Sequence, residues 1–186
     1  MTKHDLRQSL RQRRTAFVEA MDLAERCAHL AALTARVLRE VDGVGSVSAY
    51  LAVGAEIDPS AILDAAANAG VETALPFVGT ASAPMRFFAW KPGDTLIPGP
   101  LGLLQPDPET AREVAPALIL APLVGFDRTL MRLGQGKAFY DRAFAALPEA
   151  RRIGLAWSVQ EADAVPFDPW DVPLHAVATE KEWITR

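Results

Sequence analysis

One stretch of the chain, residues 117–142, constrains the fold more than any other. It begins with an almost unbroken apolar run over residues 117–126, as a strand buried on both faces requires. It continues through a basic segment that contains Gly134 and Gly136, and from Phe139 onward its apolar residues recur at a helical period. A strand, a glycine loop and a helix in this order predict an α/β fold with an anion-binding loop.

The rest of the chain alternates between helical and strand patterns. Residues 2–40 contain neither proline nor glycine and predict an N-terminal helical segment in one or two pieces. A helix at 60–69, with Pro59 at its first position, is expected after a cap near Asp58. Strands are expected at 44–53, 71–77, 84–90, 152–157 and 177–179, with a short helix or turn at 158–163. We therefore predict a single three-layer α/β domain over residues 1–186, with a mixed, largely parallel central sheet covered by helices on both faces.

Composition narrows the classes of partner. The net charge of −4 argues against bulk affinity for nucleic acid or an anionic membrane, and no apolar run approaches the ~20 residues of a membrane span. The single cysteine, Cys27, rules out an internal disulfide and fits a reducing compartment. The first twenty residues are rich in arginine, but they lead straight into a helix, which disfavours a mitochondrial transit peptide. We expect a cytoplasmic monomer that binds neither nucleic acid nor membrane.

The glycine loop does not match the common nucleotide-binding fingerprints. A Walker A motif needs serine or threonine after Gly-Lys, whereas Ala138 follows Lys137. A dinucleotide fingerprint needs glycine at position 139, which is phenylalanine. The alternative is a plain turn without a ligand, but Arg132 and Lys137 beside the glycines favour an anion cradle of another type.

Further charged residues have two interpretations each. Lys3, Arg7 and Arg11 recur every four residues on one helix face, either as a solvated face or as a basic stripe aimed at a polyphosphate. Glu56 follows a predicted strand end, where open α/β sheets place ligands, or it is an exposed loop carboxylate. Asp141 stands at a helix start and either favours the helix dipole or holds Mg²⁺.

A second magnesium carboxylate is available from Asp168 or Asp171 in the C-terminal proline-rich loop. The sequence shows no Ser-His-Asp grouping, nucleophile elbow or Cys-His pair, so covalent catalysis has no visible candidate. Transfer chemistry that depends on positioning and on cations remains.

These residues together resemble the 5-formyltetrahydrofolate cyclo-ligase family over residues 3–179. Four motifs carry the resemblance in order: Lys3-x-x-Leu6-Arg7, the GAEID segment at 54–58, the segment RLGQGKAFYDR at 132–142, and WDVPL at 170–174. The resemblance implies an enzyme that uses Mg-ATP to phosphorylate the formyl oxygen of 5-formyltetrahydrofolate. N10 of the folate then attacks the activated carbon, and phosphate leaves to give 5,10-methenyltetrahydrofolate. ATP is the implied co-substrate and Mg²⁺ the implied cofactor.

The resemblance also implies roles for individual residues. ATP would contact Lys3, Arg7, Arg132, Leu133, Gly134, Gln135, Gly136, Lys137, Ala138, Phe139 and Tyr140. The folate would contact Leu51, Glu56, Gln135, Gly136, Lys137, Ala138 and Phe139. Arg132, Lys137 and Tyr140 would be catalytic, and Asp141 and Asp171 would hold Mg²⁺.

Two residues depart from the family pattern. Leu130 and Ala138 stand where glycine is usual, and an alanine is strained wherever the backbone needs a positive φ. They motivate an alternative function, a catalytically weak relative that binds folate or nucleotide and acts by sequestration or regulation. A third interpretation keeps the phosphate loop but assigns a different small carboxylate as substrate.

Overall fold

The computed structural model describes residues 2–80 and 83–186. Its main sheet has seven strands in the order β11-β10-β9-β6-β1-β2-β3. These strands are β1 (Ser46–Ser48), β2 (Glu72–Phe77), β3 (Arg86–Ala89), β6 (Leu118–Pro122), β9 (Arg151–Leu155), β10 (Ala176–Ala178) and β11 (Trp183–Ile184). The inner strands from β10 to β2 run parallel, whereas β3 and β11 pair antiparallel at the two edges. The expected mixed, largely parallel sheet is confirmed.

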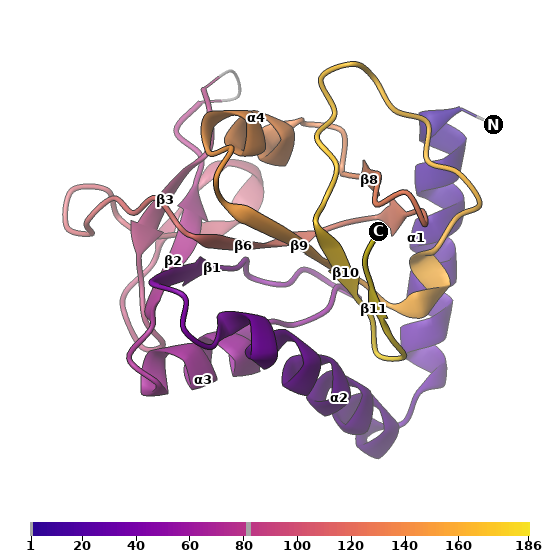
Figure 1. The fold of residues 1–186 in the computed structure, drawn as a ribbon, viewed down its shortest axis with the longest axis horizontal. Coiled ribbons are helices and arrows are strands. Elements are labelled where there is room, and N and C mark those ends of the chain that lie inside the picture. Colours follow the sequence, from indigo (N-terminus) through magenta and orange to yellow (C-terminus); the bar gives the residue numbers. More distant parts are fainter. Residues whose placement is uncertain (1, 81–82) are drawn as a thin grey trace.

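Helices lie on both sides of this sheet. They are α1 (Lys3–Ala20), α2 (Leu23–Val41), α3 (Ser60–Asn68) and α4 (Phe139–Ala146). Figure 1 shows α2 and α3 below the sheet and α4 above it. In β6, Leu118 and Leu120 pack in the cluster that contains α2 and α3, whereas Ile119 and Ala121 pack in the cluster that contains Phe144 of α4. Apolar side chains on both faces explain the continuous apolar run.

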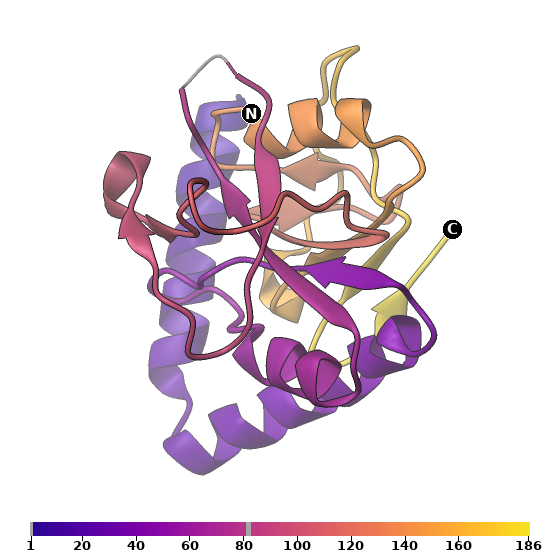
Figure 2. The same ribbon diagram turned by 90° about the vertical axis from the view of Figure 1, so that its left-hand side faces the viewer.

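Helix α1 stands at one side of the molecule and spans its layers (Figures 1 and 2). Its Leu6 and Leu10 pack against Val124 and Leu133. Leu133 belongs to the hairpin of β7 (Gly125–Phe126) and β8 (Arg132–Leu133), and Val124 directly precedes that hairpin. A Cβ at Gly125 would overlap the side chain of Leu10, so this close approach needs glycine. The contact brings the basic face of α1 against the glycine loop that follows β8.

Two predicted strands are shorter in the structure. The strand expected at 44–53 is limited to β1, because the chain leaves the sheet after Ser48 and the buried Tyr50 donates its hydroxyl to the Ile57 carbonyl oxygen. The apolar run at 117–126 is two strands in two sheets, since β6 ends at Pro122, which has no N–H to donate to a ladder.

Other boundaries differ by a few residues. The N-terminal helical segment is interrupted at Met21 and Asp22, where the Asp22 side chain caps α2. Helix α3 begins at Ser60 rather than Pro59, and Asp58 accepts a hydrogen bond from the Ser60 N–H. The predicted strands at 84–90 and 152–157 correspond to β3 and β9, and the segment at 158–163 contains the short 3₁₀ helix η2 (Ser158–Gln160).

Four short strands were not predicted. Besides β8, which falls in the segment predicted as the basic glycine loop, and β11, these are β4 (Ile97–Pro98) and β5 (Leu104–Gln105), which form a hairpin that encloses the 3₁₀ helix η1 (Pro100–Gly102) and projects at the left of Figure 2. No helix in the described parts of the chain is long and apolar enough to cross a membrane. The number of domains and the oligomeric state stay predictions.

Candidate functional site

A cavity of about 550 Å³ opens beyond the carboxyl ends of β1, β2 and β6. Tyr50, Val78 and Pro122 line it where the chain leaves or ends these three strands. Open α/β sheets bind ligands at this edge, and the volume is that of a site for a small molecule or cofactor. The β-sheet therefore presents a ligand cavity where the sequence predicts one.

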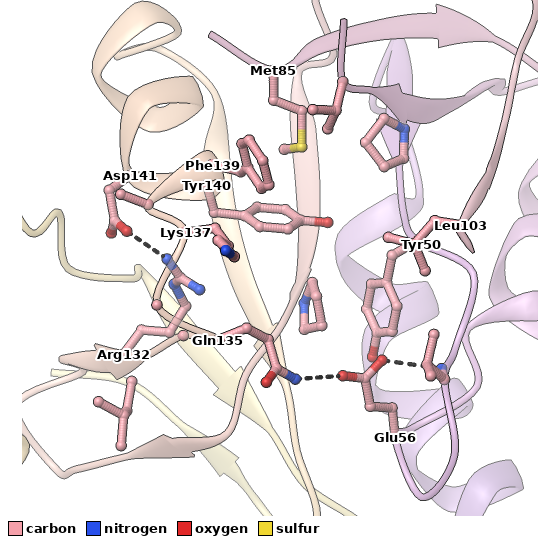
Figure 3. Close-up of a pocket in the computed structure, with 18 of the residues that line it drawn as sticks. Tyr50, Glu56, Met85, Leu103, Arg132, Gln135, Lys137, Phe139, Tyr140 and Asp141 are labelled. Carbon is pink, nitrogen blue, oxygen red and sulfur yellow. Dashed lines mark hydrogen bonds and ion pairs between the residues drawn. The ribbon is translucent and has the colours of Figure 1, made fainter. Parts of the chain in front are cut away.

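Two walls face each other across the cavity (Figure 3). The glycine loop and the start of α4 form one wall, and Tyr50, Glu56 and Leu103 belong to the other. Every residue that the resemblance assigns lines this cavity: Lys3, Arg7, Leu51, Glu56, Arg132, Leu133, Gly134, Gln135, Gly136, Lys137, Ala138, Phe139, Tyr140, Asp141 and Asp171. The chain brings these residues together, whereas their individual roles stay predictions.

Arg132, from β8, is fixed on three sides. Its Nη2 donates to Asp141 Oδ2 at 3.0 Å, and its guanidinium lies 5.5 Å from the ring centroid of Tyr140 and 5.7 Å from that of Phe144. A Cβ at Gly134 would lie 2.7 Å from Arg132 Nη1, so the glycine makes room for the guanidinium. The buried Nε of Arg132 has no hydrogen-bond partner. The cation is thus pre-positioned beside the loop, which suits a charge that binds an anion.

The loop enters α4 through an unusual backbone. Ala138 precedes the helix with φ 53° and ψ 21°, in the left-handed region, and Leu130 also has a positive φ, of 66°. The expected strain at Ala138 is confirmed, since a residue with a Cβ is disfavoured there. No side chain caps α4, so the N–H groups of its first turn remain available to an anion in the cavity.

The basic face of α1 reaches across to the site. Lys3 Nζ lies 2.6 Å from Asp168 Oδ2 and 2.7 Å from Asp171 Oδ2. Arg7 Nε donates to the Gly134 carbonyl oxygen at 2.8 Å. These contacts favour the basic-stripe interpretation of α1 over a solvated face.

The ion pair between Lys3 and Asp171 shifts the pKa values of both side chains. Partial burial lowers the pKa of Lys3, but hydrogen bonds to Asp168 and Asp171 outweigh it and raise that pKa above its usual value. Burial likewise raises the pKa of Asp171, but the hydrogen bonds from Lys3 and from the Asp168 N–H, together with the charges of Lys3 and Arg132, outweigh it and leave that pKa below its usual value. Both groups are therefore held in their charged forms at neutral pH.

Glu56 is buried, with 8% of its surface exposed, so the interpretation as an exposed loop carboxylate is wrong. Its Oε2 accepts a hydrogen bond from the Val53 N–H, and its Oε1 accepts one from Gln135 Nε2, each at 3.1 Å. The second bond joins the two walls of the cavity (Figure 3). Glu56 thus presents a fixed carboxylate to a ligand.

Two tyrosines lie on opposite walls near Glu56. Burial raises the pKa of Tyr140 and raises that of Tyr50 well above the usual value, so both phenols are neutral at working pH. The sequence pointed to Tyr140 through its motif but missed Tyr50. It also missed Met85 and Leu103, which line the cavity from segments that carry no recognisable spacing, and it gave no role to Trp170, which stands in the WDVPL motif and also lines the cavity.

The two predicted magnesium carboxylates both line the cavity, and both are paired with cations. Asp141 binds Arg132, and Asp171 binds Lys3. The described residues contain no group of three or more His, Cys, Asp or Glu side chains that could hold a metal by themselves. Any metal here would need further ligands from a substrate.

Comparisons with known proteins agree with each other. The profile of the 5-formyltetrahydrofolate cyclo-ligase family matches residues 1–180. The 5-formyltetrahydrofolate cyclo-ligase of Mycolicibacterium smegmatis is 34% identical over 149 residues, which cover 75% of each chain. The Escherichia coli protein of the same name is 30% identical over 146 residues, or 74% of this chain and 80% of that one. The solution structure of Aquifex aeolicus 5,10-methenyltetrahydrofolate synthetase superposes with a TM-score of 0.82 at 25% identity, covering 100% of this chain and 93% of that one.

Proposed function

This chain belongs to the 5-formyltetrahydrofolate cyclo-ligase family, and we propose that its cavity carries the family's reaction. The chain is an ATP-dependent ligase that converts 5-formyltetrahydrofolate to 5,10-methenyltetrahydrofolate with release of ADP and phosphate. One observation carries the site assignment: basic side chains suited to binding phosphate and the fixed carboxylate of Glu56 line the same cavity. Two ligands must react there, and the two walls offer them opposite kinds of contact.

The glycine-loop wall suits the triphosphate of ATP. Lys3, Arg7, Arg132 and Lys137 supply positive charge to a protein that is acidic overall. The uncapped start of α4 adds backbone N–H donors at the same wall. Arg132 is already fixed by Asp141 and two aromatic rings, so little reorganisation is needed when charge develops on the transferred phosphoryl group.

The Glu56 wall suits the folate. An ionised carboxylate accepts hydrogen bonds only, and the pterin ring of a folate offers neighbouring N–H donors. Leu51 and Leu103 add apolar surface for an aromatic ligand. Gln135 donates to Glu56 from the opposite wall, so the residues around it lie where the two substrates would meet. Tyr140, kept neutral by burial, is placed to donate a hydrogen bond to an oxygen in the cavity.

Asp141 and Asp171 fit Mg²⁺ as its protein ligands. Magnesium prefers oxygen donors and is commonly held by one or two carboxylates together with substrate phosphates, so the two carboxylates in the ATP half of the cavity are sufficient. When bound, the ion would neutralise charge on the triphosphate. Asp168 stays a second candidate for the same position, because it also lines the cavity and contacts Lys3.

The chemistry requires only transfer and ring closure. The formyl oxygen attacks the terminal phosphorus of ATP and the bond to ADP breaks. N10 then forms a bond to the formyl carbon, the carbon–oxygen bond breaks with loss of phosphate, and N10 gives up its proton. The residues position the reactants and stabilise charge, so no covalent intermediate with the protein is needed.

Turnover by the purified protein tests the proposal. Mixed with Mg-ATP and 5-formyltetrahydrofolate, it should form the methenyl product and ADP in equal amounts. Folate binding without product would instead support the alternative function, a catalytically weak protein that sequesters folate. The similar proteins, which are named as cyclo-ligases or synthetases, do not favour that alternative. ATP hydrolysis that is independent of folate would support a different carboxylate substrate. We also propose that the protein is cytoplasmic, because its single exposed cysteine fits a reducing compartment, and that it is a monomer. Its net negative charge argues against binding to nucleic acid or to an anionic membrane.

A further inference from the structure

A buried arginine lies directly behind Glu56. Arg14, on α1, is only 8% exposed, and its Nη1 lies 3.7 Å from Glu56 Oε1. Glu56 lines the cavity, whereas Arg14 does not. The carboxylate is therefore interposed between the cavity and the cation, so Arg14 can influence a bound ligand only through Glu56.

This placement is costly for the arginine. Among the residues that the structure describes, its buried Nε has no hydrogen-bond partner, and its Nη1 reaches the Leu123 carbonyl oxygen only at 3.5 Å. Burial lowers its pKa, and the charge of Glu56 partly offsets that effect. A buried cation with so few hydrogen bonds adds little to folding stability, and an apolar side chain of similar size would pack without this penalty. The unfavourable burial of Arg14 therefore has a use in the positive charge that it places beside the Glu56 carboxylate.

The other groups around Glu56 do not supply that charge. Tyr50 and Tyr140 are neutral, and Gln135 and the Val53 N–H are uncharged donors. Arg11 lies on the far side of Gln135, where it binds the amide oxygen of that residue. Arg14 therefore supplies the positive charge beside the Glu56 carboxylate.

We propose that Arg14 is a positioning residue whose charge holds the Glu56 carboxylate so that the Glu56 wall accepts the N–H donors of the folate. Without Arg14, only the uncharged donors of Val53 and Gln135 would hold the carboxylate, and it would accept the N–H groups of the pterin less well. The inference rests on the proposed function of the cavity as a folate site. It assigns to Arg14 no contact with either substrate.

The test compares Arg14→Met with Arg13→Met. Arg13 directly precedes Arg14 on α1. It is exposed and donates a hydrogen bond to the Glu161 carbonyl oxygen, so it is a matched control outside the cavity. At neutral pH, Arg14→Met should raise the KM for 5-formyltetrahydrofolate by roughly ten- to a hundredfold, while the KM for ATP stays within about twofold. Arg14→Lys, which keeps the charge, should recover most of the affinity.

Two results would overturn the assignment. These are an unchanged folate KM, or an equal increase in the KM for ATP. If Arg14→Met does not fold, Arg14→Lys and Arg14→Gln replace it, and a loss in Arg14→Gln that Arg14→Lys also shows would contradict the charge role. If the wild-type protein makes no methenyl product, the proposed function fails. Calorimetric titration of the same variants with 5-formyltetrahydrofolate then tests Arg14 separately, because Arg14→Met should bind the folate more weakly than Arg14→Lys does.

Discussion

Lys3 Nζ lies 2.7 Å from Asp171 Oδ2, so the first residue of α1 is joined by an ion pair to the C-terminal loop across the ATP half of the cavity. The same side chain that is proposed to bind phosphate therefore occupies the carboxylate that is proposed to bind Mg²⁺. Arg132 and Asp141 repeat this relationship on the opposite side of the glycine loop. In the proposed site, both pairs would exchange partners when Mg-ATP binds, because the cations would pair with phosphate and the carboxylates would serve as ligands of the metal.

Lys3→Gln should therefore have two opposite effects. It removes a phosphate contact and should raise the KM for ATP about tenfold. It also frees Asp168 and Asp171, so a divalent ion should bind more tightly in the absence of nucleotide. Titration with Mn²⁺ as a spectroscopic probe measures the second effect. Lys181→Gln, an exposed lysine away from the cavity, is the control. Weaker metal binding in Lys3→Gln would contradict the exchange of partners.

The same ion pair should contribute to stability only within a pH window. The pKa of Asp171 is below 3.8, so its contribution is complete above that value and is lost as pH falls through the lowered pKa. The pKa of Lys3 is above 10.5, so its contribution is complete below that value and is lost as pH rises through the raised pKa. Because both side chains are partly exposed, the contribution should stay under about 1 kcal/mol.

Thermal melting of the wild-type protein and of Lys3→Gln checks this window. The difference in Tm should be small and constant from about pH 5 to pH 9, and it should vanish in stronger acid. A difference that grows as pH falls through the neutral range would show that another group is responsible.

Arg132→Met should suppress turnover by about a hundredfold or more, because it removes a pre-positioned cation from the site of phosphoryl transfer. Its matched control is Arg128→Met, which removes an arginine that pairs with Glu161 and Glu182 on the surface. Both variants should remain folded by circular dichroism. Turnover of Arg132→Met equal to that of the control would refute the catalytic role of Arg132.

Leu130 and Ala138 both have positive φ, yet replacement by glycine should affect them oppositely. Ala138→Gly removes the strain of one left-handed residue and should stabilise the protein by about 1 kcal/mol. Leu130→Gly relieves similar strain, but it deletes a side chain that is 1% exposed and should cost a net ~2 kcal/mol or more. Urea denaturation measures both.

The effect of Ala138→Gly on turnover bears on the alternative function. A higher rate would show that the alanine obstructs the loop, and an unchanged rate would show that the loop accommodates it. Destabilisation by Ala138→Gly would contradict the assignment of backbone strain at this position.

Local patterns predicted much of the fold. The apolar periodicity of α1 and α2, the start of α3 and the helix start at Phe139 each depend on neighbouring residues, and each lies within a few residues of its expected place. The cap expected near Asp58 differs, because the residue directly before α3 makes no side-chain cap and Asp58 accepts only the first N–H of the helix. The strand expected at 44–53 was too long, because apolar residues such as Ala49 and Tyr50 are buried in an irregular segment rather than in the sheet. Burial alone does not distinguish the two.

The site was less accessible to the same reasoning. The glycine loop and the stripe on α1 have recognisable spacing, and the loop lines the cavity together with Lys3 and Arg7 of the stripe. The pairing of Arg14 with Glu56 depends on how α1 packs on the hairpin of β7 and β8, and no local pattern encodes a contact over that distance in the chain. Tyr50 and Leu103 were missed for the same reason, since they reach the cavity from segments without a motif.

The central claim is that ATP phosphorylates the formyl oxygen of the folate in this cavity. Its most direct test uses 5-formyltetrahydrofolate labelled with a heavy oxygen isotope in the formyl group, followed by mass analysis of the released inorganic phosphate. The account predicts one labelled oxygen in each phosphate released, and an equal amount of methenyl product. Label that appears in water, with unlabelled phosphate, would contradict it.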